Sequence, residues 1–257
     1  VDLGQNPKEK SDTVTVLEKI GHFLDDEVQR LFNWFKAENY SNQQINTLIA
    51  EHIDVQRLLQ RACRKFDGGY IMAGLMGHGD AFVMRDPSAI RPAFYYQDEE
   101  IVVVASERPA IQTCMNVHHT EVQELKRGHA LIIKKNGKVT EELCKDQLPR
   151  TACSFERIYF SRGTDRDIYL ERKKLGELLA PAIMKEIDND IKNTVFSFIP
   201  NTAEVAYFGM VEGIQKEVDK INKKKLLELG TDATEEDIDR LPEEICLYPD
   251  SLSAEEE

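Results

Sequence analysis

The chain has 257 residues, long enough for one large domain or two ordinary ones, and its 41% hydrophobic and 31% charged residues describe a soluble globular protein. Its net charge of −13 argues against a nucleic-acid-binding surface, which is normally basic, and no apolar run approaches the length of a membrane span. Since Val1 is followed by no basic region and no apolar signal segment, we expect a cytoplasmic protein rather than a secreted one.

Two helices are predicted before the first strand. Ser11-Asp12 offers side chains that can accept hydrogen bonds from a first turn, and apolar residues then recur at helical spacing as far as Phe35. A similar pattern predicts a second helix over about residues 42–66, which ends at Gly68-Gly69.

Strand signals follow closely between residues 70 and 143. Asn136-Gly137 between two apolar runs is a strong hairpin signal, and a short helix is predicted near residues 109–114. The continuous apolar run at residues 101–107 is typical of a strand buried on both faces. These runs predict a largely antiparallel sheet, with strands at residues 70–76, 81–86, 93–97, 101–107, 129–135 and 138–143.

The pattern changes near Pro149, which suggests a domain junction. Beyond it we expect a strand over residues 154–162, an amphipathic helix over about 168–188, a short strand over 194–200 and a helix from about Ala203. The last two elements would form a strand-loop-helix unit, and the helix N-terminus in such a unit is a common place to bind an anion.

The end of the chain and the cysteines carry weaker signals. Residues 231–257 contain Arg240 as their only basic residue, and a charge block of this kind predicts a solvated or disordered tail. The five cysteines lack the spacing of a disulfide framework or a zinc site, so reduced thiols are expected. No base for a nucleophilic Cys153 can be identified, and we predict a buried, inert thiol there.

Four stretches resemble segments of the amidophosphoribosyltransferases, the glutamine phosphoribosylpyrophosphate (PRPP) amidotransferases. The Arg-Asp-Pro turn among them is shared with asparagine synthetases, whereas the last stretch and the order of all four are specific to this family. The resemblance spans about residues 12–213. The four stretches are SDTVTVLEKI at residues 11–20, GGYIMAGLMGHGDAFVMRDPSAIRP at 68–92, VVVASERPAIQT at 102–113 and CSFERIYFSRGTD at 153–165.

The resemblance implies an α+β fold in two parts. Residues 1–150 would be a class II glutamine amidotransferase domain, a partial N-terminal-nucleophile (αββα) glutaminase domain that lacks its N-terminal part. Residues 151–257 would be the link and the start of an α/β type I phosphoribosyltransferase domain, with the acidic tail. The family's nucleophile is a cysteine at the mature N-terminus, where this sequence has Val1. We therefore expect an internal fragment that has no catalytic residue of its own and is inactive by itself.

The parent of such a fragment would be a glycosyltransferase of de novo purine biosynthesis. It would transfer the amide nitrogen of glutamine to PRPP and so make 5-phosphoribosylamine, the first step of that pathway. Mg²⁺ would neutralise the diphosphate leaving group, and family members commonly form homo-oligomers. Some members carry an iron–sulfur cluster, but Cys153 is the only candidate ligand in this sequence and no cluster is expected.

The resemblance also assigns binding residues. Asp12 would bind the α-amino group of glutamine, or would serve only as a helix N-cap. Asn201, Thr202 and Ala203 would form the loop that contacts pyrophosphate, with the Thr202 hydroxyl on magnesium. Asn201 stands where the family has an acidic residue, and a simple helix cap at Asn201 or Thr202 is the alternative.

The turn at residues 85–92 would be architectural. Ion pairing of Arg85 and Asp86 would hold it, and Arg91-Pro92 would stiffen the return of the chain to the sheet. Ala89 replaces the family's usual glycine. Because a non-glycine residue at positive φ is uncommon, we expect a slightly different backbone there.

Two alternatives stay open. An asparagine-synthetase-like class II amidotransferase would carry an SGGLDS-type loop after the link, and the sequence has none. A non-catalytic scaffold with the same fold would account for the departures at Ala89 and Asn201.

Overall fold

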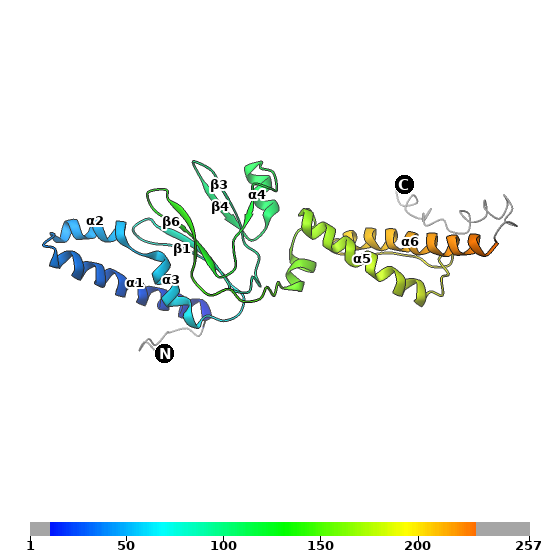
Figure 1. Ribbon diagram of the computed structural model, residues 1–257, viewed down its shortest axis with the longest axis horizontal. Coiled ribbons are helices and arrows are strands. Elements are labelled where there is room, and N and C mark those ends of the chain that lie inside the picture. Colours follow the sequence, from blue (N-terminus) through cyan, green and yellow to red (C-terminus); the bar gives the residue numbers. More distant parts are fainter. Residues whose placement is uncertain (1–10, 230–257) are drawn as a thin grey trace. The chain divides into compact units, whose positions relative to one another are not determined.

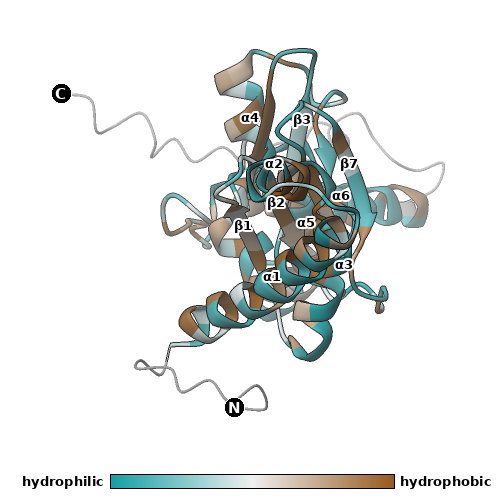
Figure 2. Cartoon of the chain, turned by 90° about the vertical axis from the view of Figure 1, so that its left-hand side faces the viewer, coloured by the Kyte–Doolittle hydropathy of each residue, from teal (hydrophilic) through white to brown (hydrophobic). Residues whose placement is uncertain are grey.

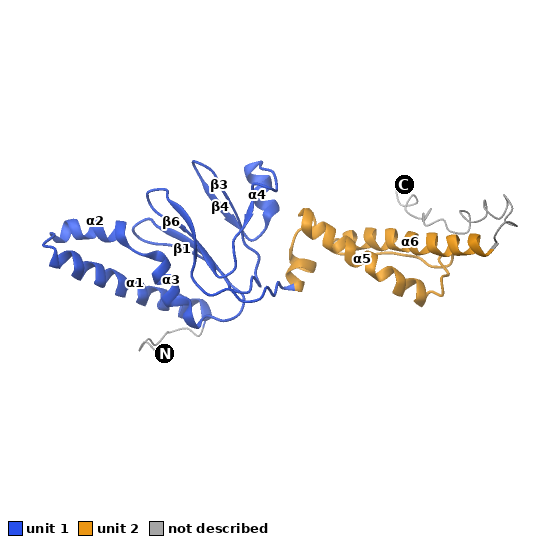
Figure 3. Cartoon of the chain, viewed as in Figure 1, with its two compact units in different colours: residues 1–153 blue, residues 154–257 orange. Residues whose placement is uncertain are grey.

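The computed structural model describes residues 11–229. The chain divides into two compact units, residues 1–153 and 154–257, which are coloured separately in Figure 3. The boundary lies close to Pro149, where the sequence pattern changes. The predicted acidic tail lies outside the described residues. Within the described part of the chain, no helix is long and apolar enough to cross a membrane.

Unit 1 begins with helices α1 (Asp12–Ala37), α2 (Asn42–His52) and α3 (Val55–Ala62), followed by the short 3-10 helix η1 (Cys63–Lys65) (Figure 1). The first helix begins where the sequence predicts. The prediction of one helix over residues 42–66 is wrong, because the chain breaks at Ile53-Asp54. There the Asp54 side chain accepts a 2.9 Å hydrogen bond from the N–H of Arg57 and so caps a new helix.

The strands of unit 1 pair antiparallel, as predicted, but in two sheets. A four-stranded sheet has the order β1-β2-β6-β7, and a three-stranded sheet has the order β4-β3-β5. The prediction that residues 101–107 are buried on both faces is wrong, since β4 lies at a sheet edge and its four residues are half-buried. Helix α4 (Arg108–Met115) packs beside β3 and β4. The strands are β1 (Ile71–Leu75), β2 (Ala81–Arg85), β3 (Phe94–Gln97), β4 (Val102–Ala105), β5 (Gln123–Glu124), β6 (His129–Ile133) and β7 (Val139–Leu143).

The four-stranded sheet separates two hydrophobic cores. In β2, Phe82 and Met84 pack against the helices, whereas Val83 between them packs toward the three-stranded sheet. Strand β6 alternates in the same way, with Ile132 in the first core and Leu131 in the second. Both faces of β2 are thus buried, and it is hydrophobic over most of its length (Figure 2). Unit 1 is a layer of helices, a four-stranded sheet and a three-stranded sheet.

A buried carboxylate ties the β1–β2 turn to neighbouring elements. Asp80 is 1% exposed, accepts a 2.8 Å hydrogen bond from the N–H of Lys135 and forms an ion pair with Lys134, and His78 Nε2 lies 2.9 Å from its carboxylate. Lys134 Nζ also donates to the Ile53 carbonyl at 3.2 Å, which links the sheet to the break between α2 and α3. Burial raises the pKa of Asp80, but the hydrogen bonds from Lys134, His78 and Lys135 outweigh it, and the pKa lies below its usual value.

This cluster predicts a pH dependence of stability. The folded-state pKa of Asp80 is lower than that of an unfolded aspartate, about 3.9, so its contribution is present above that pH and is lost as the pH falls further. Asp80→Asn is expected to lower the free energy of unfolding at pH 7 by about 2 kcal/mol and to flatten its decline below pH ~4. Urea unfolding at several pH values measures both effects, and an unchanged acid limb would contradict this role.

Unit 2 consists mainly of helices. A π-helical turn, η2 (Glu156–Phe160), precedes α5 (Arg166–Glu186) and α6 (Glu204–Leu229). The predicted strand over residues 154–162 is therefore wrong. The Arg172 side chain in α5 holds the turn by donating to the carbonyl oxygens of Arg157 and Ser161, at 3.0 and 2.5 Å.

The short strand predicted over residues 194–200 is also wrong. No strand occurs among the described residues of unit 2, and the side chains of Val195 and Ile199 are 87% and 83% exposed. A strand needs a neighbour to bond its N–H and C=O groups. The core of the unit lies instead between α5 and α6, where Ala180, Met184, Ile214 and Val218 are buried.

Candidate functional site

The turn at residues 85–92, here called the corner, is built around one buried carboxylate. Asp86 is fully buried, and its two oxygens accept hydrogen bonds from the N–H groups of Ser88 (3.0 Å), Ile90 (2.9 Å) and Arg91 (3.1 Å). Its own carbonyl accepts from the N–H of Gly128 at 3.0 Å. Asp86 therefore fixes the path of the corner and ties it to the loop before β6.

Arg85 holds the corner from the other side. Its side chain is 3% exposed, and its guanidinium donates to the carbonyls of Arg91 (2.8 Å) and Leu125 (2.5 Å). Its ion pair is with Glu124, at 2.9 Å between Nη1 and Oε1. Arg85 and Asp86 both hold the corner, but the predicted ion pairing between them is wrong. Asp86 accepts backbone N–H groups, and the carboxylate partner of Arg85 is Glu124.

Ala89 adopts the backbone that a glycine would adopt. Its φ is 51°, in the left-handed region, and the residue is 4% exposed. The expectation of a different backbone at this position is therefore wrong, because the bonds from Ser88, Ile90 and Arg91 to Asp86 hold the turn in place. An alanine in this region is strained by about 1 kcal/mol.

Ala89→Gly is accordingly expected to stabilise unit 1. Relief of the left-handed strain outweighs the extra entropy of glycine in the unfolded chain, for a net gain of about 0.5 kcal/mol. Ala93→Gly is the matched control, since Ala93 is also buried but does not have a positive φ, and it should destabilise by about 1 kcal/mol. Denaturant midpoints measure both, and a loss of stability in Ala89→Gly would contradict the strain.

Asp12 lies in the first turn of α1 and is exposed. Ser11 occupies the N-cap position, although its side chain makes no capping hydrogen bond. A carboxylate in a first turn is favoured by the helix dipole and can still offer its oxygens to an amino group in solution. Its binding of glutamine stays a prediction.

The predicted pyrophosphate loop lies just before α6. Asn201 is exposed, Thr202 and Ala203 are half-buried, and the Ala203 carbonyl accepts a 2.9 Å bond from the N–H of Tyr207 in the helix. A hollow of about 440 Å³ beside this loop is mainly apolar, lined by Ala203 together with Leu179, Ser197, Phe198, Ile199, Ala206, Tyr207 and Met210. Anion binding here would depend on the backbone N–H groups that open α6.

The donors near Thr202 do not make a magnesium site by themselves. Magnesium takes six oxygen ligands, commonly including one or two carboxylates. The loop supplies a hydroxyl from Thr202 and an amide from Asn201, and no group of three or more His, Cys, Asp or Glu side chains gathers anywhere within residues 11–229. Magnesium therefore stays a prediction from the resemblance. Cys153, the one candidate cluster ligand, is half-buried rather than buried as predicted.

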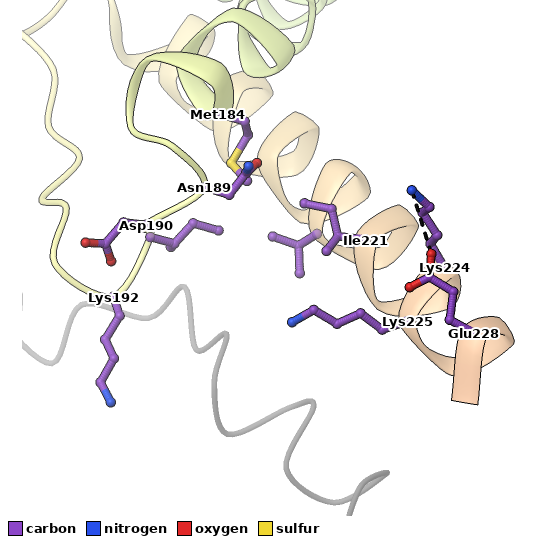
Figure 4. Close-up of a pocket in the computed structure, with 10 residues that line it drawn as sticks. Met184, Asn189, Asp190, Lys192, Ile221, Lys224, Lys225 and Glu228 are labelled. Carbon is purple, nitrogen blue, oxygen red and sulfur yellow. Dashed lines mark ion pairs between the residues drawn. The ribbon is translucent and has the colours of Figure 1, made fainter. Parts of the chain in front are cut away.

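A larger hollow in unit 2, of about 640 Å³, lies between the end of α5 and the last turns of α6 (Figure 4). Lys192, Lys224 and Lys225 line it, and Lys224 faces Glu228 at 3.8 Å. No residue predicted for a site lines this hollow, so it gives no support to the assigned roles.

Sequence reasoning missed the partners of the corner. Glu124 and Leu125 contact Arg85 from 39 and 40 residues away along the chain. They belong to or follow β5, which has only two residues and carries no periodic signal. Glu124 and Leu125 belong to no recognisable motif, so no sequence signal marks them as partners of the corner.

Comparison with known proteins finds sequence relatives among the amidophosphoribosyltransferases. No protein-family model matches the sequence. The amidophosphoribosyltransferase of Pseudomonas aeruginosa is 34% identical over 149 residues, which cover 54% of this chain and 28% of that protein. The chloroplastic amidophosphoribosyltransferase of Glycine max is 29% identical over 154 residues, which cover 58% and 25%. The chain thus spans about a quarter of the length of these curated relatives.

The fold has a solved counterpart. The glutamine PRPP amidotransferase from B. subtilis, solved in complex with ADP and GMP, superposes with a TM-score of 0.54 over 83% of this chain and 40% of that one, at 21% sequence identity. At this identity the match concerns the fold alone. Together with the sequence relatives it confirms the resemblance: the chain is a relative of the amidophosphoribosyltransferases.

Proposed function

We propose that this chain is part of an amidophosphoribosyltransferase, contributing most of a glutaminase domain and the start of a phosphoribosyltransferase domain. The observation that carries the proposal is the 34% identity with the Pseudomonas aeruginosa enzyme over 149 residues. In the parent protein, ammonia released from the glutamine amide attacks C1 of PRPP and displaces pyrophosphate. The products are glutamate, 5-phosphoribosylamine and pyrophosphate.

The described residues have supporting roles in this reaction. Asp12 pairs with the α-amino group of glutamine, which orients the amide toward the nucleophile. The corner joins β2 of the four-stranded sheet to β3 of the three-stranded sheet, so it helps to hold the two sheets in place. At the start of α6, backbone N–H groups and the Thr202 hydroxyl bind the pyrophosphate of PRPP, where the helix dipole favours negative charge.

Asp12→Ala in the parent protein tests the glutamine assignment. Loss of a charge-assisted contact to the amino group is expected to raise the KM for glutamine about tenfold or more. Synthesis driven by free ammonia should change little, because ammonia does not use that contact. Asp25→Ala, another exposed aspartate of α1, is the matched control and should leave both activities unchanged. An unchanged glutamine KM in Asp12→Ala would make Asp12 only a residue of the helix start.

A further inference from the structure

A hollow of about 320 Å³ opens beside the corner in unit 1 and has no part in the proposed chemistry. Four cationic side chains line it, and Glu124 is the one carboxylate among its lining residues. The cations are Arg85, Lys126, Arg127 and Arg150. Arg85 is almost fully buried, whereas the others reach solvent to different degrees. The hollow is therefore cationic and open to a small ligand.

The positive charges are only partly neutralised. One oxygen of Glu124, Oε1, is shared by Arg85 at 2.9 Å and Arg150 at 3.3 Å. Lys126 has a partner of its own, Glu141, at 3.0 Å. Two carboxylates therefore face four cations, which leaves an excess of two positive charges.

Arg127 accounts for much of this excess positive charge. Its Nε lies 3.5 Å from the side-chain oxygen of Gln147, a long and uncharged contact. Among residues 11–229, no carboxylate lies within ion-pair distance of its guanidinium. A half-buried arginine without a counter-charge is placed to receive an anion.

The segments that carry these arginines are fixed to the corner. Next to Arg127, Gly128 donates its N–H to the Asp86 carbonyl at 3.0 Å, and a Cβ at Gly128 would lie 2.2 Å from the Lys145 carbonyl. Beside Arg150, the N–H of Thr151 donates to the Ser88 carbonyl at 2.9 Å. Both guanidinium groups are therefore presented on backbone that is already ordered, which lowers the entropy lost on binding.

We propose that this hollow binds a small phosphoryl-bearing dianion, held by Arg127 and Arg150 above the buried guanidinium of Arg85. Arginine forks match phosphate oxygens in bidentate geometry, and a phosphate monoester carries close to two negative charges at neutral pH, equal to the excess charge of the hollow. The volume is at the lower end of that of ligand pockets, so it suits a phosphate group with a small substituent.

The test is calorimetric titration of the full 257-residue chain with inorganic phosphate and with pyrophosphate, at constant ionic strength. Binding of either anion is expected in the wild type. Arg127→Gln and Arg150→Gln should each weaken it about tenfold or more. Glu124→Gln removes the competing carboxylate and should tighten it. Lys138→Gln, an exposed lysine outside the hollow, is the control and should leave affinity unchanged.

The proposal is independent of the proposed function, since that places pyrophosphate at the start of α6 in unit 2. Anion binding that survives Arg127→Gln and Arg150→Gln but is lost in Thr202→Ala would move the site to that loop and overturn the proposal. Absence of binding by both anions at millimolar concentration would also overturn it. Tighter binding in Glu124→Gln together with weaker binding in Arg127→Gln would support it in a way that general misfolding could not imitate.

Discussion

Asp86→Ala is expected to lower the free energy of unfolding of unit 1 by about 4 kcal/mol. The substitution leaves three N–H groups of the corner, those of Ser88, Ile90 and Arg91, without their charged acceptor, and each bond of this kind contributes about 1.5–3 kcal/mol. Because a domain is stable by only about 5–15 kcal/mol, unit 1 would lose a large part of its stability. Trp34 is the one tryptophan of the sequence and lies in α1, so its fluorescence in urea reports on this unit.

Asp98→Ala is the matched control. Asp98 also accepts two backbone N–H bonds, from Glu100 and Ile101 at 2.8 Å each, but it lies in an exposed turn where water can replace it. Asp98→Ala should lower the free energy of unfolding by no more than about 1 kcal/mol. If Asp86→Ala were no more destabilising than Asp98→Ala, the corner would not depend on its buried carboxylate.

The second large effect is expected where α5 and α6 meet in unit 2. A Cβ at Gly176 would lie 1.7 Å from the Ala206 carbonyl oxygen, and a Cβ at Gly209 would lie 1.8 Å from that of Lys173. Both obstacles are backbone atoms, which no rotamer change can move. Gly176→Ala or Gly209→Ala must therefore push the helices apart and loosen the core around Ile214, for a loss of about 3 kcal/mol.

Hydrogen exchange of the amides in α5 and α6 measures this loss, because unit 2 contains no tryptophan. The same substitution at Gly21, in the middle of α1, is the control, since apart from its chain neighbours and the nearby backbone of α1 no atom lies within 4 Å of its added Cβ. Gly21→Ala should stabilise α1 by about 0.8 kcal/mol, because alanine is the better helix former. Unchanged protection in Gly176→Ala would mean that the two helices do not approach so closely.

The local patterns of unit 1 could be predicted, but their partners could not. Short continuous apolar runs in β2 and β6 indicate strands, and Asn136-Gly137 indicates the hairpin between β6 and β7. The break at Asp54 carries a usable signal, an aspartate just before an apolar helix, which was overridden by the longer helical pattern. The contact between Arg85 and Glu124 depends on tertiary structure that no local pattern contains.

Unit 2 departs further from its sequence patterns, and for a physical reason. The apolar runs around Tyr159 and Phe196 have the composition of strands, but strands form only where a neighbour completes their hydrogen bonds. The described residues of this unit offer no such neighbour, so one run forms a helical turn and the other an extended loop. The identification of Asp12 and Thr202 came from resemblance, because an exposed aspartate and a loop threonine have no physical feature that marks a substrate site.

The central claim is tested most directly by following glutamate and pyrophosphate release in the full-length parent protein, with glutamine, PRPP and magnesium present together or omitted one at a time. The account predicts that the two products appear in equal amounts and only when all three are present. Glutamate without pyrophosphate would indicate a class II amidotransferase with a different acceptor. Release of neither product would contradict the claim that the parent protein is an amidophosphoribosyltransferase, and would favour a non-catalytic scaffold with the same fold.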